Sequence, residues 1–444
     1  MSFFTEIQQR IDTALKHTDD TETVLIGNDV LPQTGTVFRR HFGNQTAVLV
    51  ADVNTWNAAG QKVTAQLQSE GQTQLLPPFI FAEEHFHADD VHLEQLQTFL
   101  KTTDAVPIAA GSGTVNDLTK AVSHRCRRSY LVCGTAASMD GYTSFGASIE
   151  VNGFKRTLEC PAPKAVLIAL DVLQTAPAAM NASGYADLYA KIPAGADWIL
   201  ADLIGTEPLH PAAWEMIQNP LRAYLANPDG IVEKDTKALA LLAEGLIMSG
   251  LAMQLAKTSR TASGAEHLFS HLWDNRHHTF NGTAPSHGEK VGIGTLATSA
   301  LYEKFLEIPK SYFAEAKEKL PLYYRDWNTV SQYITESFGN TPLAEQVMEQ
   351  SRQKFISKEE IQRRLTLFGE HWDVLRERIR QQVFPAAKVR DDLRRAGAPH
   401  RPEDIGIDAA MYRQSFADAQ CIRCRYNILD FTRETGLWNT WFPD

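Results

Sequence analysis

The alternation of hydrophobic and polar positions changes character about halfway along the chain. In the first part, short apolar runs alternate with amphipathic segments, which is typical of a parallel sheet with crossover helices. In chain order the pattern predicts a strand over 47–52, a helix over 56–71, a strand over 75–81, a helix over 91–103, a strand over 106–111, a helix over 115–124 and a strand over 129–134. We therefore expect a doubly wound α/β region.

From about residue 205 the strand-like runs end, and apolar residues recur at steps of three and four. One such stripe is formed by Ile361, Leu365, Phe368, Trp372, Leu375 and Ile379. A chain of 444 residues is long enough for two hydrophobic cores. The sequence predicts a Rossmann-like domain over 1–181 and an all-helical domain over 182–444, with the boundary in the proline-containing segment 175–184.

Two segments of the sequence bear on whether the protein is exported or inserted into a membrane. Residues 238–256 approach the length that spans a bilayer but carry Glu244 and Gln254, so we predict a buried helix. The first twenty residues place Ile7 and Ile11 on one helix face and lack the basic start and apolar run of a secretory signal. We expect neither export nor membrane insertion.

Composition narrows the class of protein. The 43% hydrophobic and 22% charged residues are ordinary for a globular fold, and a net charge of −10 disfavours general affinity for nucleic acid or an anionic membrane. Five cysteines are too few for a disulfide framework, which suggests a reducing compartment, the cytoplasm. Cys421 and Cys424 form a CxxC pair on what reads as a helix, but no second pair follows, which disfavours a redox or zinc role.

The segment AAGSGTVNDLTK links a predicted strand to a predicted helix. Gly111 and Gly113 permit a sharp turn, and the N–H groups at the helix start can bind a pyrophosphate. Asn116 occupies the third position of a GxGxxG motif, so nucleotide binding and a plain connection both remain open. Asp52 ends an earlier strand, where it can bind an adenosine ribose or cap a helix.

A second candidate segment is GTAASMDGYTS, residues 134–144, which also follows a predicted strand. Small and hydroxyl residues surround Asp140 there. Ligands bind at the carboxyl ends of parallel strands in such sheets, although a capped turn has the same composition.

Histidines are concentrated between residues 264 and 292. His267 and His271 lie four residues apart on one face of a predicted helix, a spacing that suits a common ion but also occurs on solvated surfaces. His287 precedes the next apolar helix, and Asp187 could add an oxygen ligand. One carboxylate with two imidazoles suits a divalent metal such as zinc, nickel or iron.

Taken together, these motifs resemble a known family. GSGTVNDLTK, TAASMDGYTS, GFKRTLECPAPKAV, SGYADLYAK, SGAEHLFSH, SHGEKVGIGT and the later RRAGAPHRPEDIGI and RCRYNILDF look like successive signatures of the sn-glycerol-1-phosphate dehydrogenases, especially their bacterial branch. That family belongs to the superfamily of iron-dependent alcohol dehydrogenases and dehydroquinate synthases. The resemblance implies a dehydroquinate synthase-like architecture, with a Rossmann-like domain followed by an α-helical one.

The resemblance also implies the roles of individual residues. It makes Asp187, His267 and His287 the metal ligands, and turns Asp140, Asp187 and His271 toward the substrate. It leaves His277 and His278 as loop residues. The cofactor, NAD or NADP, would be bound by Gly113, Thr114, Val115, Asn116, Asp117, Thr135, Ala136, Ala137, Ser138 and Ser144. To these the position of Asp52 at a strand end adds a candidate contact with the ribose.

The activity implied is the reversible reduction of dihydroxyacetone phosphate to sn-glycerol 1-phosphate, a step of phospholipid biosynthesis, by a cytoplasmic homodimer. A divalent metal, zinc, nickel or iron, would act as a Lewis acid on the substrate oxygen, and His271 would transfer the proton. The alternatives are a related dehydrogenase acting on another phosphorylated or polyol alcohol, and a catalytically silent nucleotide-binding relative. A dehydroquinate synthase is disfavoured, because its usual metal carboxylate is Glu and Asp187 stands at that position.

Overall fold

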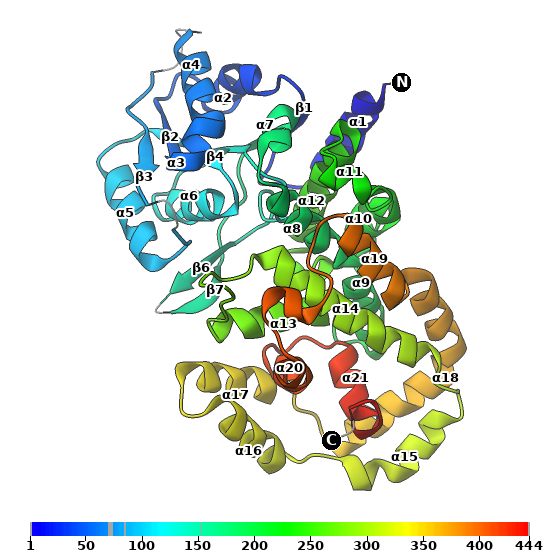
Figure 1. Ribbon diagram of the computed structural model, residues 1–444. Helices are drawn as coiled ribbons and strands as arrows, with labels where there is room; N and C mark the ends of the chain where they lie inside the picture. Colours follow the sequence, from blue (N-terminus) through cyan, green and yellow to red (C-terminus); the bar gives the residue numbers. More distant parts are fainter. Residues whose placement is uncertain (1, 70–73, 84–85, 152, 443–444) are drawn as a thin grey trace. The chain divides into compact units, whose positions relative to one another are not determined.

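The computed structural model describes residues 2–69, 74–83, 86–151 and 153–442 (Figure 1). The chain forms two compact units, and each is made of separate stretches. The sheet unit comprises Met1–Leu188, Pro211–Thr261 and Arg395–Ala398, and the helical unit comprises Tyr189–His210, Ala262–Arg394 and Pro399–Asp444. The division of function between 1–181 and 182–444 stays a prediction.

The sheet unit is built on six parallel strands in the order β1-β8-β5-β4-β2-β3. Their bounds are β1 Thr23–Gly27, β2 Ala47–Asp52, β3 Phe79–Phe81, β4 Val106–Gly111, β5 Leu131–Gly134 and β8 Ala165–Ala169. The predicted α/β region is thus confirmed, with β3 and β5 shorter than expected. The short strands β1 and β8 were missed, as was an antiparallel hairpin, β6 Ala147–Val151 with β7 Phe154–Leu158.

The strands of this sheet are mostly apolar, because helices cover the sheet. Every residue of β2, β4 and β8 is buried. On one face, Val37 and Phe38 of α2 pack with Val63 and Leu67 of α4 against the strands.

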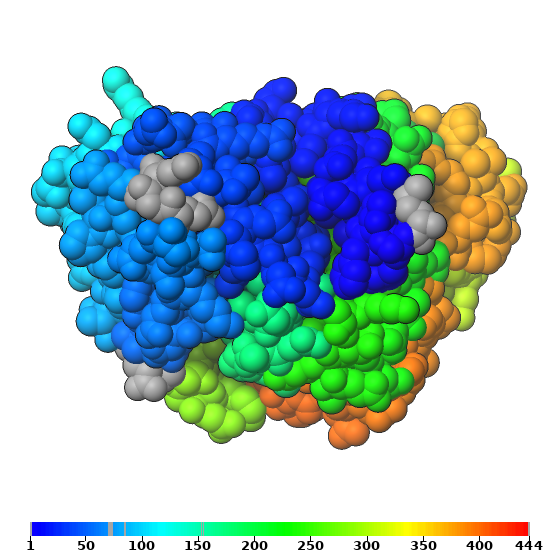
Figure 2. Space-filling model, turned by 90° about the horizontal axis from the view of Figure 1, so that it is seen from above, coloured from blue at the N-terminus to red at the C-terminus, as the bar shows by residue number. Residues whose placement is uncertain are grey.

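The helices of this unit lie before, between and after the strands, and the N-terminal segments, in blue, form much of the surface seen in Figure 2. The predicted helix over 56–71 is present as a π-helical turn, Trp56–Gly60, followed by α4; its last two predicted residues lie outside the described ones. The helices are α1 Phe3–Leu15, α2 Thr34–Phe42, α3 Val53–Thr55, α4 Gln61–Ser69, α5 Asp90–Lys101, α6 Gly113–Arg125, α7 Leu170–Thr175, α8 Ala178–Tyr189, α10 Pro211–Tyr224, α11 Asp229–Val232 and α12 Thr236–Ala256.

The predicted buried helix is α12, which is long and apolar enough to cross a membrane but is mostly buried inside the fold. Glu244 and Gln254, the two polar residues noted in the sequence, have partners within the sheet unit. The buried Glu244 accepts hydrogen bonds from Arg10 of α1 at 2.6 and 2.8 Å. Gln254 donates to the Thr21 hydroxyl at 2.9 Å and to the Thr143 carbonyl. The helix is therefore a core element, as predicted.

In the part of it that the structure describes, the helical unit has helices and no strand. They are α9 Lys191–Ile204, α13 Ala265–Asn275, α14 His287–Leu306, α15 Tyr312–Tyr323, α16 Trp327–Phe338, α17 Pro342–Lys354, α18 Lys358–Gln382, α19 Ala386–Arg395, α20 Ala409–Cys421, α21 Ile428–Glu434 and α22 Trp438–Trp441. The stripe predicted from Ile361 to Ile379 is the buried face of α18, so the all-helical prediction is confirmed.

The helix predicted through the CxxC pair ends early. α20 ends at Cys421, and a second helix, α21, begins after Asn427, which caps it by accepting a hydrogen bond from the Leu429 N–H. Cys421 is buried and Cys424 exposed, and both are free thiols.

Candidate functional site

Three neighbouring strands of the sheet, β5, β4 and β2, end at one edge with predicted cofactor residues. The turn after β4 leads directly into α6, which begins at Gly113 with Ser112 as its N-cap. A Cβ at Gly111 would lie 2.3 Å from the Cβ of Val115, so this turn requires glycine. The first N–H groups of α6 have no acceptor within the helix and can receive an anion.

The side chains next along α6 turn inward. Val115 and Asn116 are fully buried, and the Tyr130 hydroxyl donates to Asn116 Oδ1 at 2.9 Å. Asn116, which occupies the third position of the GxGxxG motif, therefore links α6 to Tyr130 just before β5. Any contact of Val115 or Asn116 with a cofactor is restricted to their backbone groups.

A buried lysine that sequence reasoning did not single out fixes the loop after β5. Lys120 Nζ donates to the carbonyls of Gly141, Ser144 and Gly146 at 2.8, 2.8 and 3.0 Å. Burial lowers the pKa of Lys120, and the neighbouring Asp117 carboxylate opposes that effect. Burial also disfavours the charged form of Asp117, and for this carboxyl group it raises the pKa.

Close backbone approaches hold the same loop from two other sides. A Cβ at Gly184 of α8 would lie 1.8 Å from the Ala137 carbonyl oxygen, and one at Gly250 of α12 would lie 2.1 Å from Thr143 Oγ1. Thr135, Ala136, Ala137 and Ser144 are all buried. The predicted cofactor and substrate segment is therefore a fixed element of the sheet unit.

Asp140 and Asp187 are brought together within this unit. The Asp140 N–H donates to Asp187 Oδ2 at 3.1 Å, and Asp140 Oδ2 accepts a hydrogen bond from Ser249 Oγ of α12 at 2.8 Å. Asp187 is fully buried on α8. Ser249 was missed because no local motif marks it.

Asp52 occupies the end of β2 and caps α3. Its Oδ1 accepts a hydrogen bond from the Thr55 N–H at 2.8 Å, and the Thr55 hydroxyl lies 3.0 Å from the Asp52 nitrogen. The helix-cap interpretation is thus correct, and ribose binding stays a prediction.

In the helical unit, two helices present the three histidines to one another. His267 and His271 lie on α13 with ring centroids 6.2 Å apart, and the ring of His287, the first residue of α14, lies 5.3 Å from that of His267. Ser286 and Glu289 form a capping box that fixes the start of α14. A Cβ at Gly294 would lie 2.2 Å from the Glu266 carbonyl oxygen, so glycine lets α14 pack closely on α13.

A buried glutamate orients the first histidine. Glu266 Oε1 lies 2.9 Å from His267 Nδ1 and also accepts a hydrogen bond from the Gly264 N–H at 2.6 Å. A proton on Nδ1 leaves Nε2 as the lone-pair nitrogen. Carboxylates that accept a hydrogen bond from a metal-binding histidine impose this arrangement. Sequence reasoning missed Glu266, although its position next to His267 was the available signal.

Two further histidines, His277 and His278, and two lysines that lie in the quoted motifs, Lys191 and Lys290, have the following surroundings. His278 Nε2 lies 2.7 Å from the Ile405 carbonyl, and His277 has a positive φ of 50°. Lys290 forms an ion pair with Asp274, and Lys191 is fully buried at the start of α9.

Comparison with known proteins places the chain in a family. Residues 25–177 match the family model described as iron-containing alcohol dehydrogenase. A Halalkalibacterium halodurans protein named glycerol-1-phosphate dehydrogenase (NAD(P)+) is 37% identical over 57% of this chain and 64% of its own length, slightly less than two thirds. A Geobacillus thermodenitrificans protein of the same name is 32% identical over 68% of this chain and 77% of its own.

A solved structure has the same fold. The crystal structure of a probable glycerol dehydrogenase from Sinorhizobium meliloti matches with a TM-score of 0.59 and 14% identity, over 95% of this chain and 96% of that one. The sheet, the histidine-bearing helices and the extended similarity to the Geobacillus protein agree with one another. The chain therefore belongs to the glycerol-1-phosphate dehydrogenase family.

Proposed function

We propose that this protein reduces dihydroxyacetone phosphate reversibly to sn-glycerol 1-phosphate, using NADH or NADPH and a divalent metal. The observation that carries the proposal is the presence of three possible metal ligands in a member of this family. Asp187 is buried, and His267 is oriented by Glu266 and lies beside His287. The two named relatives carry this activity in their names.

We propose Asp187, His267 and His287 as the metal ligands. They supply one carboxylate and two imidazoles, a donor set that can hold a metal ion. This set fits zinc, nickel and iron, since all three accept nitrogen and oxygen ligands. A bound divalent ion supplies Lewis-acid polarisation of the substrate oxygen.

We propose that NAD(P) binds at the strand ends of the sheet unit. The predicted contacts are the α6 start from Gly113 to Asp117, the loop from Thr135 to Ser138, and Ser144. Asp52 favours NAD, because a carboxylate repels a ribose 2′-phosphate. The three hydrogen bonds from Lys120 Nζ to the loop after β5 support this assignment, because a cofactor site needs a loop of fixed conformation.

The chain's own residues would position the substrate and move one proton. Asp140, held by Ser249, and Asp187 would face the substrate hydroxyl groups, while His271 would exchange a proton between the substrate oxygen and solvent. The ring of His271 is partly exposed, as a group that contacts solvent must be.

The test is NADH oxidation with dihydroxyacetone phosphate, using metal-stripped protein resupplied separately with zinc, nickel or iron. We expect one metal to restore activity and the product to have the sn-1 configuration. His267→Ala should abolish metal-dependent activity, while His277→Ala, a matched control outside the donor set, should retain it. Oxidation of NADH with glycerone or another polyol ketone but not with the phosphate would reject the substrate.

The protein is further proposed to act in the cytoplasm as a homodimer. Light scattering on the purified chain tests the assembly directly: a mass twice that of the chain supports it, and the mass of a single chain contradicts it.

A further inference from the structure

The helical unit contains a cavity of about 110 Å³ whose lining residues differ from every residue proposed for catalysis. It lies among the chain after α15, the ends of α17 and α20, and α21. A buried water needs roughly 10–15 Å³ by this kind of measure, so the cavity has room for a small ligand. Its charged lining residues are Arg325, Lys354, Asp430, Arg433 and Glu434, and we call it the Arg433 cavity.

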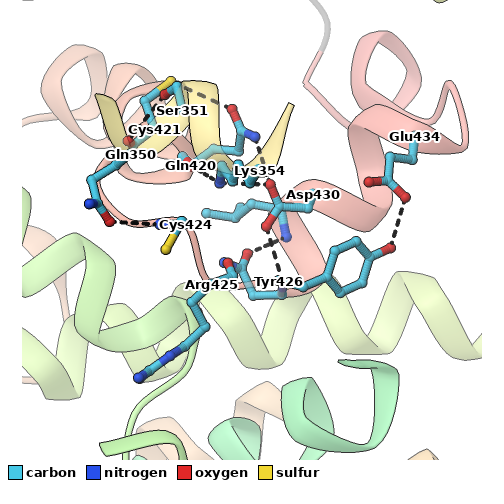
Figure 3. A network of polar contacts seen from close by, with 12 residues as sticks. Gln350, Ser351, Lys354, Gln420, Cys421, Cys424, Arg425, Tyr426, Asp430 and Glu434 are labelled. Atoms are coloured by element: carbon cyan, nitrogen blue, oxygen red, sulfur yellow. Dashed lines mark hydrogen bonds and ion pairs between the residues drawn. The ribbon is translucent and has the colours of Figure 1, made fainter. Parts of the chain in front are cut away.

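Asp430, the first of the two acidic residues that line the cavity, already has partners for both carboxylate oxygens. Asp430 Oδ1 accepts hydrogen bonds from Lys354 Nζ at 2.8 Å and Gln420 Nε2 at 2.7 Å, and Oδ2 accepts one from the Asn427 N–H at 3.1 Å (Figure 3). These contacts use both carboxylate oxygens and the only lysine that lines the cavity.

The second acidic group is neutralised as well. Glu434 Oε1 accepts a hydrogen bond from Arg364 Nη1 at 2.6 Å, and the Tyr426 hydroxyl lies 3.2 Å from Oε2. Burial raises the pKa of Glu434 to about 8. Neither carboxylate therefore offers a vacant oxygen to a metal cation, and the cavity does not have the lining of a cation site.

Two arginines remain without a counter-charge. Among the described residues, neither Arg325 nor Arg433 forms an ion pair. Arg433 stacks on the Trp438 ring at 3.3 Å, and its buried Nε has no hydrogen-bond partner. Arg325 lies over the Tyr333 ring at 5.2 Å. Burial, and then the like charge of Arg325, lower the pKa of Arg433 to about 9, so the charged guanidinium is costly as it stands.

We propose that the Arg433 cavity binds a small oxyanion, a phosphate or a carboxylate, between the guanidinium groups of Arg325 and Arg433. A guanidinium pairs with either oxyanion through two parallel N–H donors, and a buried cation gains most from such a partner. Tyr324 and Phe355 add aromatic surface to the lining of the cavity. The proposal is independent of the proposed function, because it uses none of the same residues.

The experiment is a calorimetric and fluorescence titration of the full-length protein with inorganic phosphate and, separately, with acetate. The substrate proposed above carries a phosphate group, so inorganic phosphate is also expected to bind at the proposed substrate site. The local signal is therefore the emission of Trp438, which contacts Arg433. We expect one of the anions to change that emission saturably, and Trp438→Phe to remove the change without removing binding.

Substitutions test which groups hold the anion. Arg325→Gln and Arg433→Gln should each weaken this binding on the order of ten- to hundredfold. Arg378→Gln, an exposed arginine on α18, is the matched control and should leave the affinity unchanged. Arg325 is partly exposed, so its variant is expected to fold even where Arg433→Gln does not.

Each result decides the proposal. Loss of the Trp438 response in Arg325→Gln, with NADH-dependent activity unchanged, supports a separate anion site. The proposal is overturned by equal affinity in wild-type protein and Arg325→Gln, or by the absence of a Trp438 response to both anions up to the millimolar range.

Discussion

Glu266 acts on the proposed metal site without being one of the proposed ligands. Glu266 is fully buried and fixes the His267 ring through Nδ1. Its second role is to accept a hydrogen bond from the Gly264 N–H just before α13. Orientation of His267 is therefore built into the start of the helix.

Glu266→Gln should lower metal affinity roughly 10- to 100-fold, because a neutral amide no longer enforces the His267 tautomer. Competition with a chromophoric chelator measures this affinity. Glu318→Gln, an exposed glutamate on α15, serves as the control. Equal affinities of the Glu266 variant and the wild type would remove Glu266 from the site.

His271 is expected to act on the proton and not on the metal. His271→Ala should retain normal metal content while turnover falls roughly 10²- to 10⁴-fold, the usual contribution of a positioned acid or base. Steady-state rates across pH check the predicted fall in turnover, and the metal content measured in parallel checks that the ion is retained. Unchanged turnover at every pH, or loss of the metal, would contradict the assignment.

At this scale the sequence revealed residue types but not their partners. The histidines and Asp187 stand in recognisable motifs, whereas Ser249 is identified only by its bond to Asp140, more than a hundred residues away. Lys120 was overlooked for the same reason, since the carbonyls it binds belong to another segment. Such contacts depend on the tertiary fold, which local patterns do not contain.

Among the elements, α12 shows how a polar residue is accommodated in an apolar helix. Glu244 is fully buried, and the only charge that reaches it among the described residues is that of Arg10, whose side chain is 39% exposed. Hydrogen bonding to Glu244 raises the pKa of Arg10 further. The pair ties α1 to α12.

Arg10→Ala should destabilise the protein by roughly 3 kcal/mol, the lower end of the range for a broken buried pair, because Arg10 is partly exposed. Glu244→Leu should recover most of that loss in the double variant, since it removes the stranded charge. Chemical denaturation of the four proteins in the cycle measures both effects. Equal stabilities of the single and double variants would show that Glu244 is not stranded.

Elements with a strong periodic pattern were the ones predicted well. The buried stripe of α18 matches the sequence residue by residue, because amphipathicity alone determines which face is buried. The strands β1 and β8 were missed although β3 and β5, which were predicted, are shorter, so length alone does not explain the omission. The β6–β7 hairpin, also missed, follows a small-residue loop. The break between α20 and α21 was missed, because the sequence there reads as one continuous helical pattern.

For the molecule as a whole, pH sensitivity should arise partly from Glu434. Its pKa is raised from 4.5 to about 8 by burial, so the folded state retains a proton that the unfolded state has lost. The associated stabilisation is fully present below pH 4.5 and is lost as the pH rises through about 8.

We therefore expect Glu434→Gln to reduce the fall in thermal midpoint between pH 4.5 and about 8. Thermal unfolding of the variant, the wild type and the Glu318→Gln control across that window checks the prediction. A slope identical to that of the wild type would mean that Glu434 does not exchange its proton on unfolding.

The discontinuity of the sheet unit bears on how the protein is made. All six strands of its sheet are complete by Ala169, yet α12, which packs on α1, α7, α10 and β1, begins only at Thr236, after a stretch that belongs to the other unit. The ribosome synthesises the chain from its N-terminus, so the strands are made before α12. The surface that α12 covers in the folded protein is therefore exposed until α12 has been made. Chains arrested before Thr236 should consequently be held by chaperones or degraded, whereas chains arrested beyond Thr261 can already protect the sheet.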